Sequence, residues 1–255
     1  MSIRDLKLLK TKKGRDEAGL FMIEGERFVQ EIPLTWHVMQ YIIARRYALT
    51  HDISQYEMRA SCEIVRDSIF DSLADTVSPQ GVIAVCKKRE FHLEEVLKRP
   101  PPHFILLGEN LNDPGNIGAL VRTAAAAGAC GIILTIGSGD IYNSKVLRAA
   151  AGAVLRLPII SNMTLQEALI MLAKSDIPTY AAHPRGNMLP YDLDLGKSFC
   201  LLVGNESHGI SDTAAELASN LVTLPMVNNT ESLNASVAGS ILMYEAVRQR
   251  TQIKI

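Results

Sequence analysis

The chain has 255 residues, of which 47% are hydrophobic and 21% charged, and its formal net charge is −1. These values are typical of a globular protein that buries its own core, and the length suits one large domain or two modest ones. The overall charge gives no indication of a nucleic-acid partner, and no apolar run is long enough to span a bilayer.

The first 15 residues are more basic than the rest of the chain. They contain one acid, Asp5, and six bases: Arg4, Lys7, Lys10, Lys12, Lys13 and Arg15. Such a cluster is either a solvated helix face or a small patch that docks phosphates. The N-terminus has no apolar stretch of the signal-peptide type, so we expect no export signal.

A domain boundary is predicted near residues 87–102. The strand-like run GVIAVC (81–86) ends in a charged stretch, and the triplet Pro100-Pro101-Pro102 follows. Three prolines in a row mark an extended connector, because proline fixes φ and donates no hydrogen bond. Residues 1–99 carry 31 charged side chains, whereas the longer segment 100–255 carries only 22. Because it has fewer charges for its length, we expect the second part to form the better hydrophobic core. We therefore expect domains at 1–99 and 100–255.

The second part alternates between strand-like and helix-like segments. Strands are expected at 103–107, 131–135, 198–204 and 221–226. Helices are expected at 117–129, 164–175 and 232–250, with Thr164 and Glu167 as a capping box. This alternation predicts an α/β fold with a mostly parallel sheet.

Three polar loops follow three of these strands, at 108–122, 204–211 and 227–239. In open α/β sheets, ligands bind beyond the carboxyl ends of the strands, so the loops predict one shared site for a polar ligand. Each loop taken alone could be an ordinary turn. Asn116 and Ser232 could likewise be simple helix N-caps.

Several other chemistries lack their sequence signals. No strand is followed by GxGxxG, which argues against a nicotinamide dehydrogenase, and the phosphate-loop and GxSxG patterns are absent. The cysteines are far apart and form no zinc-type spacing, so we expect no metal. They are interpreted as reduced, mostly buried thiols of a cytoplasmic protein: Cys62, Cys86, Cys130 and Cys200.

Three segments carry a family resemblance. In order and spacing, 111–134, 201–211 and 224–250 resemble the three signature motifs of the SpoU (TrmH) family, RNA ribose 2′-O-methyltransferases of the SPOUT superfamily. Segments 19–31 and 74–85 are similar to the accessory domain of rRNA-directed members, which has the fold of ribosomal proteins that bind kinked RNA.

The resemblance implies a fold and a methyl donor. The second domain would be a parallel-sheet methyltransferase domain with a C-terminal trefoil knot, and it would form a homodimer through this region. The donor would be S-adenosylmethionine. Gly204, Leu224 and Leu233 would contact it largely through backbone groups, while Val203 and Met226 would form the walls around its adenine.

The resemblance also implies catalytic residues. Arg122 occupies the family's catalytic position, as a general base or as a clamp for the target phosphate and the developing alkoxide. The second role is favoured, because a guanidinium stays protonated and accepts no hydrogen bond. Ser232 and Asn234 would orient the ribose and the charged end of the donor, and Glu206 would brace the motif loops.

RNA contacts complete the predicted site. Asn116 would position the target nucleotide near Arg122, and Lys145 and Arg148 would contact phosphates at the rim. The predicted function is methylation of a ribose 2′-hydroxyl in structured RNA. Ribosomal RNA, and large-subunit RNA in particular, is favoured by the long N-terminal domain. The alternatives are a tRNA methyltransferase and an RNA-binding module with an inactive transferase half.

Overall fold

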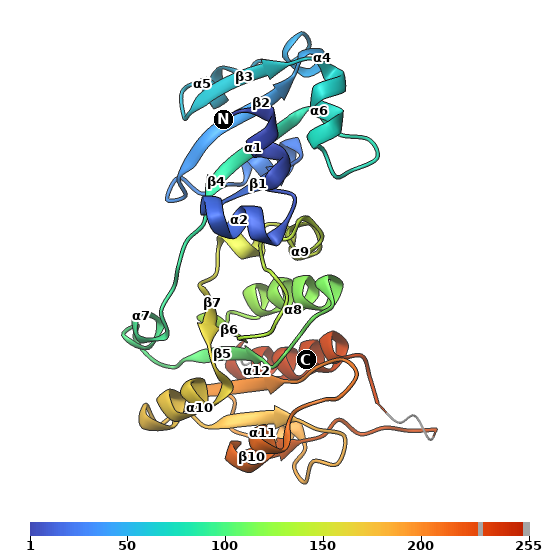
Figure 1. Ribbon diagram of the computed structural model, residues 1–255. Coiled ribbons are helices and arrows are strands. Elements are labelled where there is room, and N and C mark those ends of the chain that lie inside the picture. The colour runs from blue at the N-terminus through green and yellow to red at the C-terminus, as the bar shows by residue number, and fades with distance from the viewer. Residues whose placement is uncertain (229–231, 252–255) are drawn as a thin grey trace. The chain divides into compact units, whose positions relative to one another are not determined.

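The computed structural model describes residues 1–228 and 232–251, and it divides into two compact units (Figure 1). The first unit contains Met1–Arg89 and Asp140–Leu155, and the second contains Glu90–Gly139 and the chain from Arg156 onward. Residues 140–155, expected in the second domain, therefore belong to the first compact unit. The assignment of RNA binding to 1–99 and methyl transfer to 100–255 stays a prediction.

The first unit is built on a mixed four-stranded sheet of order β1-β4-β2-β3. Only β2 and β3 pair in parallel. The strands are β1 (Leu20–Glu24), β2 (Val38–Ala44), β3 (Ser61–Val65) and β4 (Val82–Lys87). The helices are α1 (Ile3–Leu8), α2 (Lys12–Ala18), α3 (Glu26–Gln30), α4 (Arg45–Ala48), α5 (Ser54–Glu57), α6 (Asp67–Leu73), α9 (Ser144–Ala150) and the 3₁₀ turn η1 (Ala153–Leu155).

Packing explains why residues 140–155 join this unit. The guanidinium of Arg15, 4% exposed, forms an ion pair of 2.6 Å with the carboxylate of Asp140. The rings of Phe21 and Tyr142 lie with centroids 4.3 Å apart, and the indole N–H of Trp36 donates to the carbonyl of Leu155 at 2.8 Å. The segment therefore supplies part of the first unit's core.

The second unit contains a six-stranded, all-parallel sheet of order β10-β8-β9-β5-β6-β7, which confirms the predicted α/β fold. The strands are β5 (Phe104–Gly108), β6 (Gly131–Thr135), β7 (Ile159–Met163), β8 (Thr179–Ala182), β9 (Phe199–Val203) and β10 (Asn220–Val222). The helices are α7 (Leu93–Leu97), α8 (Pro114–Ala126), α10 (Leu165–Lys174), α11 (Asp212–Leu217), α12 (Ala235–Thr251) and the 3₁₀ turn η2 (Pro190–Asp192).

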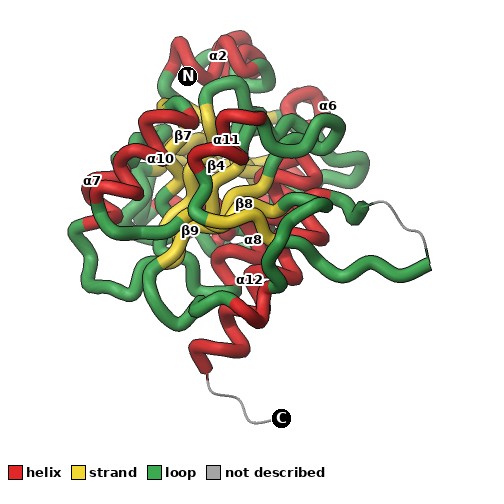
Figure 2. The backbone as a smooth tube through the Cα atoms, turned by 90° about the horizontal axis from the view of Figure 1, so that it is seen from below, coloured by secondary structure: helices red, strands yellow, loops and turns green. Residues whose placement is uncertain are grey.

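Helices cover both faces of this sheet, with α7, α10 and α11 on one side and α8 and α12 on the other (Figure 2). Alternate strand residues such as Ile105, Leu107 and Leu202 share a buried cluster with residues of α7, α10 and α11. Every residue of β5, β6 and β9 is buried, as expected for central strands of a parallel sheet. No helix in the described part of the chain is long and apolar enough to cross a membrane.

The predicted elements agree with the structure in type, with differences at their ends. The capping box of Thr164 and Glu167 is confirmed at the start of α10. The strand expected at 221–226 extends only over Asn220–Val222, because the chain turns away beside Pro225 to form the third motif loop. Strands β7 and β8 were not predicted, since β8 has four residues and β7 is buried only at its first two.

The four cysteines are free thiols, as predicted. Cys86 and Cys200 are buried, and Cys62 and Cys130 are half-buried. Burial raises the pKa of all four thiols, that of Cys86 to about 12. A raised pKa keeps a thiol protonated, so these side chains are poor nucleophiles and metal ligands at neutral pH.

Candidate active site

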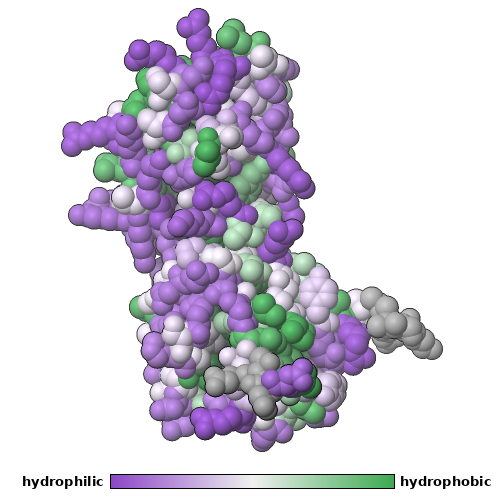
Figure 3. Space-filling view, turned by 90° about the vertical axis from the view of Figure 1, so that its right-hand side faces the viewer, coloured by the Kyte–Doolittle hydropathy of each residue, from purple (hydrophilic) through white to green (hydrophobic). Residues whose placement is uncertain are grey.

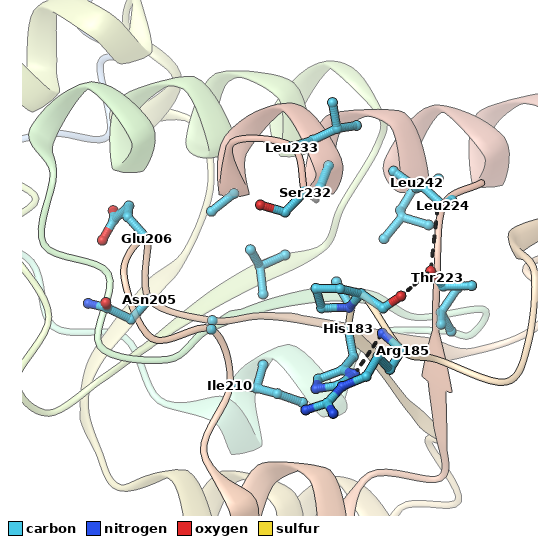
Figure 4. A pocket seen from close by; sticks show the side chains of 18 of the residues that line it. His183, Arg185, Asn205, Glu206, Ile210, Thr223, Leu224, Ser232, Leu233 and Leu242 are labelled. Atoms are coloured by element: carbon cyan, nitrogen blue, oxygen red, sulfur yellow. Dashed lines mark hydrogen bonds between the residues drawn. The ribbon is translucent and has the colours of Figure 1, made fainter. Parts of the chain in front are cut away.

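A cavity of about 340 Å³ opens at the carboxyl ends of β8, β9 and β10 (Figure 4). Its walls come from the loops that follow these strands and from the first turns of α12. This is where ligands bind in open α/β sheets, and the volume suits a small organic ligand. All five residues that are predicted to bind the methyl donor line the cavity: Val203, Gly204, Leu224, Met226 and Leu233.

Gly204 explains why backbone groups face this cavity. A Cβ atom on Gly204 would lie 2.2 Å from the carbonyl carbon of Gly209, closer than any real contact. The loop folds back because the N–H groups of Asn205 and Gly209 each donate to the other's carbonyl at 2.9 Å. Only glycine is compatible with this turn, and its backbone is left open to a ligand.

The two ends of the cavity differ in polarity. Leu224 and Leu242 lie at one end, and Asn205 and Glu206 lie at the other (Figure 4). S-adenosylmethionine has the same division, with a flat adenine that packs against apolar walls and a charged methionine part that needs polar surroundings. The lining residues therefore fit this donor.

A hydrogen-bond network joins the three motif loops. The carboxylate of Glu206 accepts from the backbone N–H groups of Asn112 (3.4 Å) and Asp113 (3.2 Å), and from the side-chain amide of Asn116 (3.2 Å). The amide oxygen of Asn116 accepts from Asn234 at 3.0 Å and from the hydroxyl of Ser236 at 3.1 Å. These contacts agree with a bracing role for Glu206 and show that Asn116 is bound to both other motifs.

Neither Asn116 nor Ser232 is a helix cap. Helix α8 is capped by Asp113, whose carboxylate accepts the N–H of Asn116 at 2.8 Å. At the start of α12, the amide oxygen of Asn234 accepts the N–H groups of Ser236 (2.9 Å) and Val237 (3.3 Å). The side chain of Asn234 thus fixes the end of α12 and also contacts Asn116, while Ser232 lines the cavity.

Arg122 lies on α8, exposed to solvent. It is not among the residues that line the cavity, and its side chain has no hydrogen bond or ion pair with another described residue. Within a single chain, Arg122 is therefore not brought to the residues that are predicted to bind the methyl donor.

Lys145 and Arg148 lie on α9, which belongs to the first unit. Both are exposed, and Arg148 borders a small hollow of that unit beside Glu24 and Asp75. The two bases are therefore accessible, as RNA contacts need to be, but they are part of a different compact unit from the other predicted site residues.

The loop after β8 supplies cavity residues that the sequence analysis missed. His183, Pro184 and Arg185 line the cavity, together with Ile210 and Thr223. The loop was missed because its four-residue strand was not recognised. The apolar run before His183 and the Pro and Gly after it are the signal that could have found it. In the described chain, no group of three His, Cys, Asp or Glu residues could hold a metal ion.

Comparisons with known proteins agree with this geometry. Residues 103–244 match the family model described as the SpoU rRNA Methylase family, and residues 1–84 match the MRM3-like substrate binding domain. The chain is 32% identical over 243 residues to the 23S rRNA (guanosine(2553)-2′-O)-methyltransferase RlmP of Bacillus subtilis, covering 95% of this chain and 94% of that protein.

Solved structures are similar over almost the whole chain. The SpoU methyltransferase AviRb of Streptomyces viridochromogenes, in complex with the cofactor AdoMet, superposes with a TM-score of 0.87 at 25% identity, covering 98% of this chain and 97% of that one. An AdoMet-bound rRNA methyltransferase of Sinorhizobium meliloti gives 0.84 at 27% identity, covering 96% and 94%. The chain therefore belongs to the SpoU rRNA methylase family, as its motifs predicted, and is an S-adenosylmethionine-dependent methyltransferase.

Proposed function

We propose that this chain transfers the methyl group of S-adenosylmethionine to the 2′-hydroxyl of a ribose in ribosomal RNA, with large-subunit RNA favoured. The observation that carries the proposal is the cavity beyond β8, β9 and β10, where all five predicted donor residues surround the open backbone of Gly204. The similarity to the 23S rRNA methyltransferase RlmP supports the choice of RNA. The similarity to this bacterial enzyme also supports a cytoplasmic location.

The cavity residues would hold the donor by its two different ends. Val203, Leu224 and Met226 offer apolar surface for adenine, and the backbone at Gly204 and Leu233 offers hydrogen bonds. Ser232, at the wall of the cavity, would orient the ribose of the target. The sulfonium of a bound donor supplies a methyl group already activated for transfer, so the protein's task is alignment and charge stabilisation.

Arg122 would stabilise negative charge as the ribose oxygen loses its proton. It stays protonated at neutral pH, so it acts as a donor to the oxygen and to the adjoining phosphate rather than as a base. Asn116 and Asn234 would act indirectly, by fixing the ends of α8 and α12 on either side of the reaction.

A homodimer would complete the site. Hydrophobic side chains gather on one face of the second unit (Figure 3). On α12, Val237, Ile241 and Tyr244 are 47%, 45% and 54% exposed and share one helix face, which is typical of a surface that a partner covers. Since α12 packs along α8, a second copy on this face would lie close to Arg122. We propose that Arg122 of one chain serves the cavity of the other.

The first unit would bind the RNA. Five bases of the N-terminal cluster remain exposed: Arg4, Lys7, Lys10, Lys12 and Lys13. Lys10 and Lys13 also form ion pairs, with Asp75 at 3.0 Å and Glu17 at 3.8 Å, whereas Arg15 is buried in its ion pair and cannot contact RNA. Lys145 and Arg148 add exposed positive charge to this unit. We also expect the C-terminal part of the second unit to form the trefoil knot.

Methyl transfer from tritiated S-adenosylmethionine to ribosomal RNA, with tRNA as the comparison, tests the proposal. We expect incorporation into ribosomal RNA only. Arg122→Ala should abolish transfer while donor affinity, measured by calorimetry, stays unchanged. Arg122→Lys, which keeps the charge, should retain some activity. Labelling of tRNA alone, or full activity of Arg122→Ala, would contradict the proposal.

Mixing two inactive variants tests the shared site. Arg122→Ala lacks the cation, and Gly204→Val disrupts the loop that lines the cavity, because a side chain there meets the backbone of Gly209, so each homodimer should be inactive. Random exchange of subunits puts one intact site in half of the dimers, and roughly a quarter of the wild-type activity should return. If both variants are folded dimers and the mixture stays inactive, Arg122 does not act across the interface.

A further inference from the structure

The loop after β8 is held firmly against the start of the third motif. The backbone N–H of His183 donates to the carbonyl of Val222 at 2.9 Å, and the hydroxyl of Thr223 donates to the carbonyl of Pro184 at 3.0 Å. Both contacts lie directly before Leu224, at the apolar end of the cavity. His183 therefore has a defined position on the cavity wall.

The ring of His183 is oriented by its own loop. Its Nδ1 atom accepts the backbone N–H of Arg185 at 3.1 Å. A neutral imidazole that accepts at Nδ1 carries its hydrogen on Nε2, so Nε2 is a donor. Within the described chain, Nε2 has no hydrogen-bond partner, and the ring lies on the wall of the cavity near Ile210 (Figure 4).

The surroundings of the Nε2–H group of His183 indicate which acceptor it meets. Leu224, Leu242 and Ile210 give this part of the cavity an apolar lining, and the exposed side chain of Arg185 lies beside the ring of His183, whereas the carboxylate of Glu206 lies at the other end. A flat base with several acceptor nitrogens matches apolar side chains flanked by hydrogen-bond donors, of which the N–H of His183 is held in place by its own loop. The ring nitrogens N1, N3 and N7 of adenine are such acceptors, and an N–H that found no acceptor on binding would weaken affinity.

We infer that His183 reads the adenine of the methyl donor, with Nε2–H donating to a ring nitrogen of the base. This inference rests on the proposed placement of the donor in this cavity. It adds a directional side-chain contact to a site whose other predicted donor residues act through backbone groups and apolar surface.

Two substitutions distinguish the roles of the two ring nitrogens of His183. In His183→Asn, the amide can replace Nδ1 as acceptor for Arg185 but does not reach the position of Nε2. In His183→Gln, the longer side chain can place an N–H near the position of Nε2. Each variant is titrated calorimetrically with S-adenosylhomocysteine and with its 1-deaza, 3-deaza and 7-deaza analogues. His92→Phe, on an exposed residue before α7, serves as the control.

For the wild-type protein and His92→Phe, we expect one of the three analogues to bind about tenfold more weakly than S-adenosylhomocysteine, as for one lost hydrogen bond. His183→Asn should bind S-adenosylhomocysteine about tenfold more weakly and no longer distinguish that analogue. His183→Gln should still distinguish it. The inference would be overturned if His183→Asn bound S-adenosylhomocysteine as tightly as the wild type does. It would also be overturned if each deaza analogue lost the same affinity in His183→Asn as in the wild type. If the wild type binds no S-adenosylhomocysteine, the proposed function itself fails.

Discussion

Each unit of this protein joins distant parts of the chain through a polar cluster, and the two clusters differ in charge and exposure. In the first unit, Arg15 and Asp140 form an ion pair whose side chains are 5% and 10% exposed. In the second, the side chains of Glu206, Asn116 and Asn234 meet at the protein surface through amide and carboxylate hydrogen bonds.

From this difference we expect the first cluster to serve stability and the second to serve methyl transfer. A buried charge that loses its partner is strongly unfavourable, so the pair ties segment 140–155 to the first unit. Exposed amides are already solvated, so breaking one of their contacts costs less free energy of unfolding. They do, however, set the positions of the loops around the cavity. Substitutions in the first cluster should therefore change the free energy of unfolding, and those in the second should change methyl transfer.

The largest effect is expected for Asp140→Ala. It leaves the guanidinium of Arg15 buried with only the carbonyl of Leu9 as acceptor, and it should lower the free energy of unfolding by about 3–5 kcal/mol. Urea unfolding followed by the fluorescence of Trp36, the single tryptophan of the chain, measures this in the first unit.

Asp16→Ala is the matched control, because Asp16 also pairs with a base, Lys88, at 2.6 Å but is 48% exposed. It should change the free energy of unfolding by less than about 1 kcal/mol. A third variant, Arg15→Met with Asp140→Leu, removes both charges and should recover much of the loss. Equal effects of Asp140→Ala and Asp16→Ala would remove the distinction between the clusters.

The next effect is expected for Asn116→Asp. The new carboxylate would face the carboxylate of Glu206, which now accepts from the amide of Asn116 at 3.2 Å, so repulsion should separate the first and second motif loops. Methyl-transfer efficiency should fall about 100-fold, as for loss of an organised charge-stabilising group. Donor affinity should change by no more than about threefold, because Asn116 does not line the cavity.

A fall in donor affinity as large as the fall in methyl transfer would contradict this prediction. It would mean that the network shapes the cavity for the methyl donor rather than the place where the ribose reacts. Asn116→Ala sharpens the result, since it removes all three side-chain hydrogen bonds of Asn116 without adding charge and should have the smaller effect on methyl transfer.

Much of the second unit could be predicted from the sequence, because its strands are buried on both faces and read as continuous apolar runs. β5, β6 and β9 have this pattern, and the polar loops after β5, β9 and β10 meet at one edge as expected. β8 was missed because four residues are too few for a pattern. The loop that carries His183 was missed with it, although it forms one wall of the cavity.

The sequence could not predict contacts between segments far apart in the chain. Asp140 follows Gly139 in a loop that reads as part of the second domain, and only the partner 125 positions away, Arg15, explains its place in the first unit. The position of Arg122 is a similar case. Its motif identified the residue, but its distance from the cavity follows from the face of α8 on which it lies.

The smallest effect is expected for Ser236→Ala, which tests a residue that the motifs did not identify. Its hydroxyl, on a residue that is 8% exposed, has one hydrogen, which it can donate to the amide oxygen of Asn234 at 2.7 Å or to that of Asn116 at 3.1 Å. Asn116 keeps its contact with Asn234 in the variant, so only one bond of the network is lost. Methyl-transfer efficiency should fall about fivefold, as for a single hydrogen bond, with the unfolding transition little changed. Ser240→Ala is the control one turn later on α12, because it removes a similar contact, to Thr123 at 3.1 Å, that does not belong to the network. If both serine variants lower activity equally, the packing of α12 on α8 matters for the reaction and the network does not act separately from it.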